Sequence, residues 1–154
     1  MGGVEPGPLP SIRRILLGSL FAGSIGTLLE LILIGHDEMA AQLAPILLLG
    51  TGILVSGWAL FVPHRAAIRI LQLLMAVFVA SGIIGIALHY KGNEAFELEM
   101  SPSRAGISLV SKTLTGATPV LAPGSMSLLG LVGLAFAYRH PALQSQPGVG
   151  RSKE

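Results

Sequence analysis

Apolar residues gather in four long stretches, with short polar segments between them. The stretches cover residues 12–34, 44–62, 66–90 and 119–138 of a 154-residue chain. A helix rises about 1.5 Å per residue, so roughly 20 apolar residues are enough to cross the hydrocarbon core of a bilayer. The pattern therefore predicts an all-α integral membrane protein, built as an antiparallel four-helix transmembrane bundle.

Residues 12–140 form one predicted membrane domain, with a tail on either side of it. Residues 1–11 are rich in glycine and proline, which cannot sustain the interior of a helix. We therefore expect a disordered N-terminal tail at residues 1–11 and a disordered C-terminal tail at residues 141–154. One longer outer loop, at residues 91–118, connects the third and fourth apolar stretches.

The long loop combines two patterns. Residues 96–100 alternate between apolar and acidic side chains, as an exposed strand does. Farther along, Ile107, Val110 and Leu114 recur at helical spacing with polar residues between them. This second pattern predicts a short interfacial helix that lies on the bilayer.

The start of the fourth membrane helix carries conflicting signals. Thr118 is a candidate N-cap, and Pro119 suits the first helical position because its missing N–H needs no partner there. Pro123 and Gly124 follow within the first turns. We expect this pair to kink the helix or to delay its regular start to Ser125.

Composition supports the membrane class and removes several chemistries. Hydrophobic residues make up 51% of the chain and charged residues 12%, whereas soluble domains average about 25% charged. The chain has no cysteine, which excludes disulfides, cysteine zinc sites, thiolate-bound iron–sulfur clusters and cysteine nucleophiles. It also lacks the glycine-rich nucleotide-binding motifs and the common nucleophile motifs.

Basic residues indicate the orientation. If the helices alternate in direction, one side of the membrane collects seven lysines and arginines and the other side three. The seven are Arg13, Arg14, Arg65, Arg69, Arg139, Arg151 and Lys153, and the three are Lys91, Arg104 and Lys112. Because cytoplasmic segments carry the excess of bases, we expect both termini in the cytoplasm, as in a bacterial inner membrane protein. Bases beside apolar segments are expected to contact anionic lipid, so we assign no nucleic-acid partner.

Arg13 and Arg14 also precede an apolar run, which resembles a twin-arginine export signal. A signal peptide has an apolar region of about 7–15 residues and a cleavage site of small residues. Here the run continues to residue 34 and is followed by Gly35-His36-Asp37-Glu38. The longer run favours a first helix that is retained in the membrane.

Small residues at four-residue spacing predict how the helices pack. Transmembrane helices associate through close backbone approach, which small side chains permit. The candidates are Gly18, Ala22 and Gly26 in the first helix, Gly52 and Ser56 in the second, and Ser81 and Gly85 in the third. We expect these stripes to face one another inside the bundle. The alternative, that they line a permeation path, has little support because the spans hold almost no polar side chains.

Several residues with metal-ligating side chains fall near the outer surface. Glu30 is the only acidic residue within a predicted span, and a carboxylate there is expected to be neutral, paired or hydrated. His36, His89 and Glu97 with Glu30 form the candidate metal site, with Asp37, Glu38 and Glu94 as further ligands. Imidazoles with carboxylates suit zinc, iron or manganese, and two histidines could bracket a haem. The opposing interpretation is that these histidines are ordinary interfacial residues, as we also expect for His64 and His140 on the other side.

These observations favour a non-catalytic membrane protein. The leading hypothesis is a small subunit or accessory factor without a cofactor, which self-associates or joins a larger membrane complex. The first alternative is a membrane oxidoreductase or a component that binds a metal, a haem or a quinone at the outer surface. The second alternative is a small proton-coupled transporter in which Glu30 carries the proton.

Overall fold

The chain is entirely helical over the range that the computed structural model describes, residues 8–144. Five α-helices and one short 3₁₀ helix follow one another, and no strand occurs within that range. The elements are α1 (Leu9–Leu33), α2 (Ala40–Phe61), α3 (Arg65–Met100), α4 (Gly106–Leu114), α5 (Gly124–Ala137) and η1 (Pro141–Leu143).

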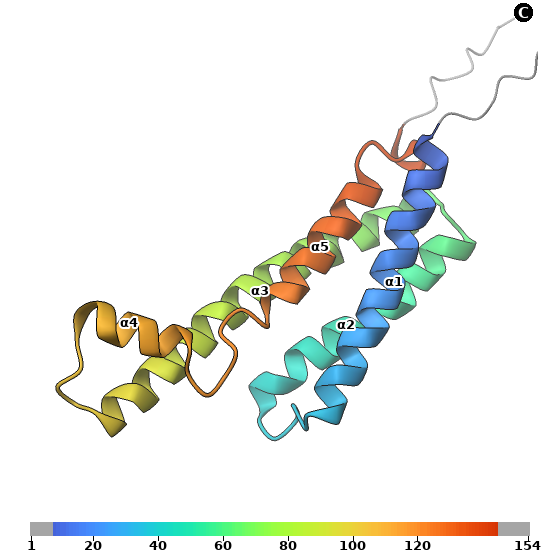
Figure 1. The fold of residues 1–154 in the computed structure, drawn as a ribbon. Helices are drawn as coiled ribbons and strands as arrows, with labels where there is room; N and C mark the ends of the chain where they lie inside the picture. The colour runs from blue at the N-terminus through green and yellow to red at the C-terminus, as the bar shows by residue number, and fades with distance from the viewer. Residues whose placement is uncertain (1–7, 145–154) are drawn as a thin grey trace, which may run out of the picture.

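Four of the helices pack side by side, and each contacts two neighbours. α1 contacts α2 and α5, and α3 contacts the same two helices, so the four surround one core. α1, α2, α3 and α5 alternate in direction (Figure 1), and α3 and α5 share the most extensive contact. Leu20, Leu49, Leu71, Met75 and Phe78 are buried at the centre.

α1, α2 and α3 are long and apolar enough to cross a membrane. Many of their large apolar side chains point outward, among them Leu33, Leu54, Phe61 and Leu73. Soluble proteins rarely expose contiguous apolar surface of this extent, whereas lipid tails cover it readily. The prediction of an all-helical protein is therefore confirmed for the described residues, and the three long apolar helices are compatible with a helical membrane protein. α5 is also apolar, but its 14 residues span only about 21 Å.

The ends of the described chain are more ordered than the sequence predicts. α1 begins at Leu9, inside the segment that was expected to be disordered, and has Pro10 in its first turn. Proline is tolerated there because the first N–H groups of a helix have no partner within the helix. Likewise, η1 occupies residues 141–143 of the expected C-terminal tail. The remaining tail residues, 1–7 and 145–154, lie outside the described residues.

The largest difference from the sequence prediction concerns α3. Its 36 residues span about 54 Å, so it continues as one helix through the polar residues 89–100. The alternation at residues 96–100 predicted a strand, which is wrong. Glutamate, alanine, leucine and methionine are all strong helix formers, and no proline interrupts the run, so the helix propagates.

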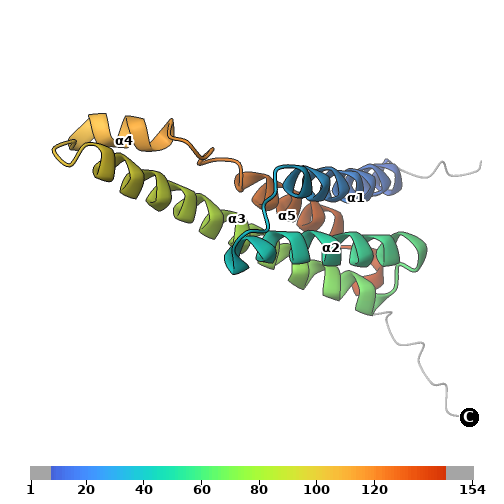
Figure 2. The ribbon, with the colours of Figure 1, turned by 90° about the horizontal axis from the view of Figure 1, so that it is seen from below.

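α4 and α5 follow the sequence prediction more closely. A short helix is present in the long loop, as expected, but it packs against the outer part of α3. The views in Figures 1 and 2 agree that α4 lies alongside this part of α3, beyond the ends of α1 and α2. Thr118 and Pro119 do not begin a helix, and α5 starts at Gly124 with Pro123 as its N-cap. The proline-glycine pair therefore delays the fourth helix, which was one of the two expected outcomes.

Candidate functional site

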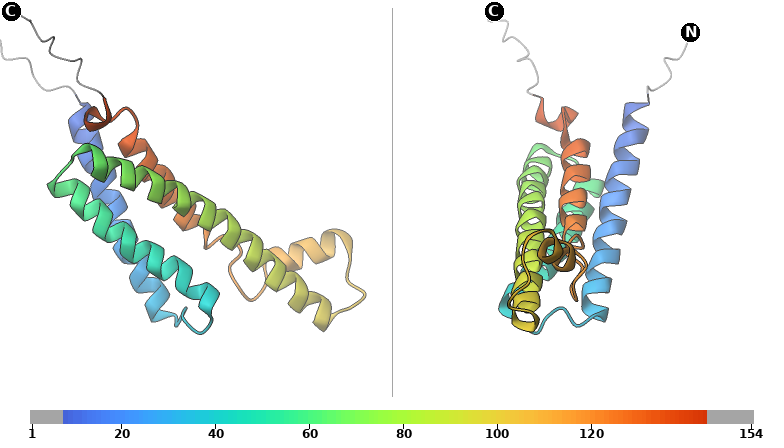
Figure 3. Two further views of the ribbon diagram at one scale, coloured as in Figure 1. Left: turned by 180° about the vertical axis from the view of Figure 1, so that it is seen from behind. Right: turned by 60° about the vertical axis from the view of Figure 1, so that its left-hand side comes forward.

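The outer part of α3, together with α4 and the segment that leads back toward α5, forms a structural unit of its own. We call residues 89–119 the outer hairpin. Figure 3 shows it projecting from the end of the bundle, with α4 against α3. The polar residues that the sequence concentrates after the third apolar stretch lie in this unit, which makes it the first place to look for function.

Asn93 holds the outer hairpin together. Its side chain is 3% exposed. Its Nδ2 atom donates to the carbonyl oxygens of Thr113 at 2.9 Å and of Thr118 at 2.8 Å. Its Oδ1 atom accepts from the backbone N–H of Thr118 at 3.2 Å and from the Thr118 hydroxyl at 2.6 Å. One amide side chain thus uses its two donors and both acceptor positions to join α3 to the end of α4 and the return segment.

Further contacts fix the hairpin on both sides of Asn93. His89 Nδ1 lies 3.0 Å from the carbonyl oxygen of Pro119, so this nitrogen carries the proton and donates to it. A Cβ atom on Gly116 would come within 2.7 Å of Asn93 Cγ, so only glycine lets the chain approach this closely. Near the tip of the hairpin, Arg104 forms an ion pair with Glu97. These contacts give the hairpin one defined conformation.

The apolar face of α4 points away from α3. The side chain of Ile107 is 88% exposed, and Val110 and Leu114 on the same face are also exposed. α3 instead covers Thr113, which is fully buried. On α3, Phe96 and Met100 are exposed as well. The outer hairpin therefore presents apolar side chains that no part of the described chain covers.

Charge is divided between the two ends of the molecule. The acidic end, formed by the last turn of α1, the α1–α2 turn and the outer hairpin, holds six carboxylates and three bases within the described residues. The opposite, basic end holds five arginines and none of the described carboxylates. The five are Arg13, Arg14, Arg65, Arg69 and Arg139. Within residues 8–144 the only ion pair is the one between Arg104 and Glu97.

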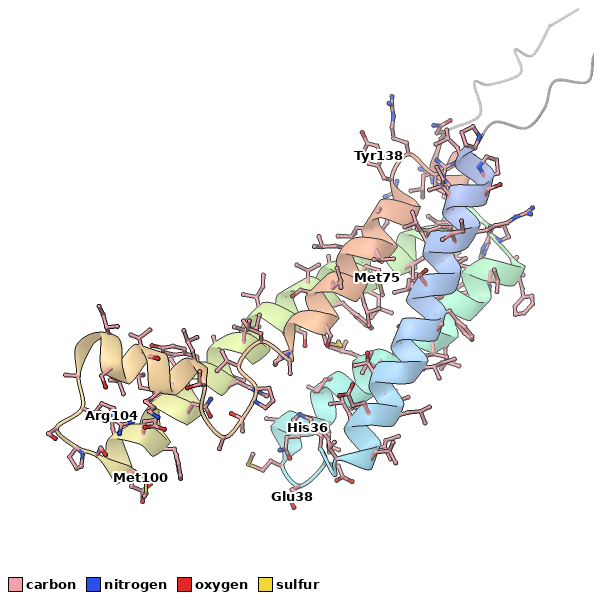
Figure 4. The ribbon with its side chains drawn as sticks, in the orientation of Figure 1. His36, Glu38, Met75, Met100, Arg104 and Tyr138 are labelled. Carbon is pink, nitrogen blue, oxygen red and sulfur yellow. The ribbon has the colours of Figure 1, made fainter. Side chains whose placement is uncertain are left out.

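The structure does not gather the candidate metal ligands. His36 and Glu38 lie at the α1–α2 turn, apart from Arg104 in the outer hairpin (Figure 4). Of the hairpin candidates, His89 donates to Pro119 and Glu97 pairs with Arg104. Among residues 8–144, no three histidine, aspartate or glutamate side chains come close enough to hold a metal ion.

The remaining candidate carboxylates lie on α1, in the α1–α2 turn and on α3. Glu30 is exposed and lies three residues before the end of α1, about 4.5 Å along the helix axis. It therefore lies in the last turn of α1. Asp37 is exposed in the α1–α2 turn, and Glu94 is half-buried in the outer part of α3.

The predicted stripes of small residues divide into two groups. Gly18 and Gly26 have no neighbouring atoms around the position of a Cβ, and Ala22 is exposed, so the α1 stripe faces outward instead of into the bundle. Gly52 does face the interior, where a Cβ would come within 2.7 Å of Phe78 Cζ. Ser56 is fully buried, and its hydroxyl donates to the carbonyl of Ile53 at 3.2 Å.

The closest helix contact joins α3 to α5 and uses glycines that the sequence prediction largely missed. A Cβ on Gly130 would lie 2.7 Å from the carbonyl oxygen of Met75, and a Cβ on Gly82 would lie 2.6 Å from the backbone nitrogen of Ser127. Of the predicted α3 pair, Gly85 approaches the ring of Pro123, and Ser81, four residues before it, is half-buried. The Ser127 hydroxyl also donates to the carbonyl of Val79 at 3.0 Å. The missed signal is the three-residue spacing of glycines in both helices.

Asn93 and Thr118 were also missed as partners. Asn93 stood in a run of charged residues, and Thr118 was interpreted as a helix cap, so nothing local joined them across 25 residues.

Comparison of the chain with protein-family models, curated proteins and solved structures finds no match.

Proposed function

We propose that this protein is a non-catalytic subunit or accessory factor of a membrane complex. In this proposal α1, α2, α3 and α5 are an antiparallel four-helix transmembrane bundle, and the outer hairpin binds a partner protein. The basic end faces the cytoplasm, because lysine and arginine are in excess there and such an excess marks cytoplasmic segments. The proposal rests mainly on one observation, the rigidly held outer hairpin with an uncovered apolar face.

A partner protein accounts for this face better than the bilayer does. The apolar part of α3 ends near Leu88, and the following residues, up to Met100, continue the helix by about 18 Å. α4 packs on this continuation, so its apolar face lies beyond the lipid when α3 stands upright. Burial of a large apolar side chain contributes about 1.5–3 kcal/mol, so covering Ile107, Val110 and Leu114 would stabilise a complex substantially.

The experiment is affinity capture of the tagged protein from its native membranes in mild detergent, with wild type and two variants compared. We expect a larger protein to co-purify stoichiometrically with the wild type and to be lost from Ile107→Glu. Ser108→Glu is the matched control, because it adds the same charge at the adjacent exposed position outside the apolar face. A protein that elutes alone, or an Ile107→Glu variant that retains the partner, would contradict the proposal.

A further inference from the structure

A groove at the basic end has the chemistry of an anion site. It has a volume of about 410 Å³ and lies between the first turns of α1, the end of α2 and the turn that follows α5. Arg13, Arg14 and His140 line it together with the apolar side chains of Leu17, Leu60 and Phe136. Figure 1 shows the start of α1 beside the turn that follows α5, at this end of the molecule. The outer hairpin is at the opposite end, so the groove is separate from the apolar face of α4.

The hydrogen bonds around the groove leave donors available. Arg13 Nη2 donates to the carbonyl oxygen of Arg139 at 3.2 Å, which holds the guanidinium in place and leaves its other N–H groups unused within the described chain. His140 Nδ1 accepts from the backbone N–H of Ala142 at 3.2 Å. The neutral imidazole therefore carries its proton on Nε2, which is a third donor group beside the two guanidinium groups.

The charges at the groove are not compensated by the described part of the chain. Arg13 and Arg14 have no carboxylate near them there, since every described carboxylate belongs to the acidic end. Burial lowers the pKa of His140, and the neighbouring Arg13 lowers it further, as expected where positive charge accumulates without a counterion. A bound anion would relieve this repulsion.

The backbone is also held in an unusual conformation at this place. Arg139 has a φ of 46°, in the left-handed region that non-glycine residues rarely adopt. This conformation directs its carbonyl oxygen to Arg13 and leads the chain to His140, whose ring lies 5.2 Å from that of Phe136. The turn after α5 thus brings His140 beside Arg13 of α1, and the two residues line the groove together.

We propose that this groove binds a phosphate group, supplied by the headgroup of an anionic lipid. Arg13 and Arg14 donate charge-assisted hydrogen bonds to the phosphate oxygens, and His140 Nε2 contributes another. A lipid is the favoured source because the apolar wall of Leu17, Leu60 and Phe136 offers a surface for an acyl chain below the headgroup. The groove also lies where membrane-crossing helices end, which is the level of lipid phosphates.

The first test is a lipid titration of the full-length protein in detergent, followed by native mass spectrometry. Phosphatidylglycerol is compared with phosphatidylcholine and with inorganic phosphate, for the wild type and two double variants. We expect Arg13→Gln with Arg14→Gln to weaken phosphatidylglycerol binding at least tenfold. Arg65→Gln with Arg69→Gln is the control, because it removes the same charge from the same end but outside the groove, and we expect a change below twofold.

Each outcome of this titration decides a part of the proposal. Equal losses in the two double variants would reduce the effect to general attraction between a basic surface and anionic lipid, and would overturn a defined site. Equal binding of phosphatidylcholine would overturn the requirement for an anionic headgroup. Displacement of the lipid by inorganic phosphate at a similar concentration would assign the groove to a soluble anion, and would overturn the lipid source.

A second test uses the wild-type protein and so does not depend on the folding of a variant. The ring signals of the histidines are followed by nuclear magnetic resonance while phosphatidylglycerol is added. We expect the His140 signals to move with saturation. The signals of His64, which makes an edge-to-face contact with Trp58 at the same end with ring centroids 5.0 Å apart, should move much less. A His140 signal that does not respond, or that moves together with His64, would contradict the site.

Discussion

Replacing Asn93 with alanine should release the outer hairpin from α3 without disturbing the rest of the bundle. The substitution removes four hydrogen bonds between 2.6 and 3.2 Å. A net contribution of about 1 kcal/mol for each bond sets an upper value of about 4 kcal/mol. Thr118 is exposed, so its groups can bond to water in the variant, whereas the Thr113 carbonyl is in a buried contact. We therefore expect a loss of about 2–3 kcal/mol in the local stability of the hairpin.

The assay is hydrogen exchange of the backbone amides, measured by mass spectrometry on the protein in detergent or nanodiscs. Local opening of a segment controls its exchange, and 2 kcal/mol corresponds to a roughly 30-fold change in an opening equilibrium. The amides of α4 and of residues 115–119 should exchange about 30-fold faster or more in Asn93→Ala. Amides in the α3–α5 contact around Gly82 and Gly130 should not change.

Lys91→Ala is the control for this prediction, because Lys91 is exposed on the adjacent part of α3 and its side chain makes no hydrogen bond within the described chain. Its exchange pattern should match that of the wild type. If α4 exchange in Asn93→Ala stays within threefold of the wild type, the buried amide does not hold the hairpin. If exchange instead rises throughout the bundle, the hairpin is not a separate unit.

Three further predictions concern other parts of the structure. Gly130→Ala should cost about 1–3 kcal/mol of thermal stability in detergent, because its Cβ would meet backbone atoms of α3, whereas Gly18→Ala should be neutral or stabilising; equal effects would contradict the packing. Burial, and to a smaller extent Arg13, lowers the pKa of His140, so the unfolded state binds the proton more readily than the folded state. The melting temperature should therefore fall as the pH drops through the ordinary pKa of histidine, and it should fall less in His140→Asn. Glu97→Gln should cost less than about 1 kcal/mol by hydrogen exchange of the hairpin tip, since its pair with Arg104 is partly exposed, and a larger loss would show a stronger role for that pair.

The apolar pattern was sufficient to predict the helices of the bundle, because long runs of apolar residues have few other stable structures. It could not predict where α3 ends. The apolar signal stops near Leu88, but the backbone continues in a helix through residues whose own propensities are helical. Five alternating residues at 96–100 are too few to override a helix that is already formed, since extending a helix is much easier than starting one.

The packing faces were harder to predict for a different reason. Gly18 and Gly26 have the same four-residue spacing that packed helices use, yet they face outward, while Gly130 packs against the backbone of α3. Spacing identifies a face of small residues, but the direction of that face depends on how the neighbouring helices are arranged. The contact between Asn93 and Thr118 likewise depends on the return path of the chain over 25 residues. Local patterns hold no information about that path.

The uninterrupted course of α3 has a mechanical consequence. The same helix forms the α5 contact in the bundle and the support of the outer hairpin, and no proline divides its 36 residues. A displacement of the hairpin by about 5 Å would tilt a stiff rod of this length by about 5°. Because Gly82 and Gly85 hold α3 within van der Waals distance of Ser127 and Pro123, α5 would have to follow or slide. A force applied at the acidic end is therefore transmitted along α3 to the other side of the molecule.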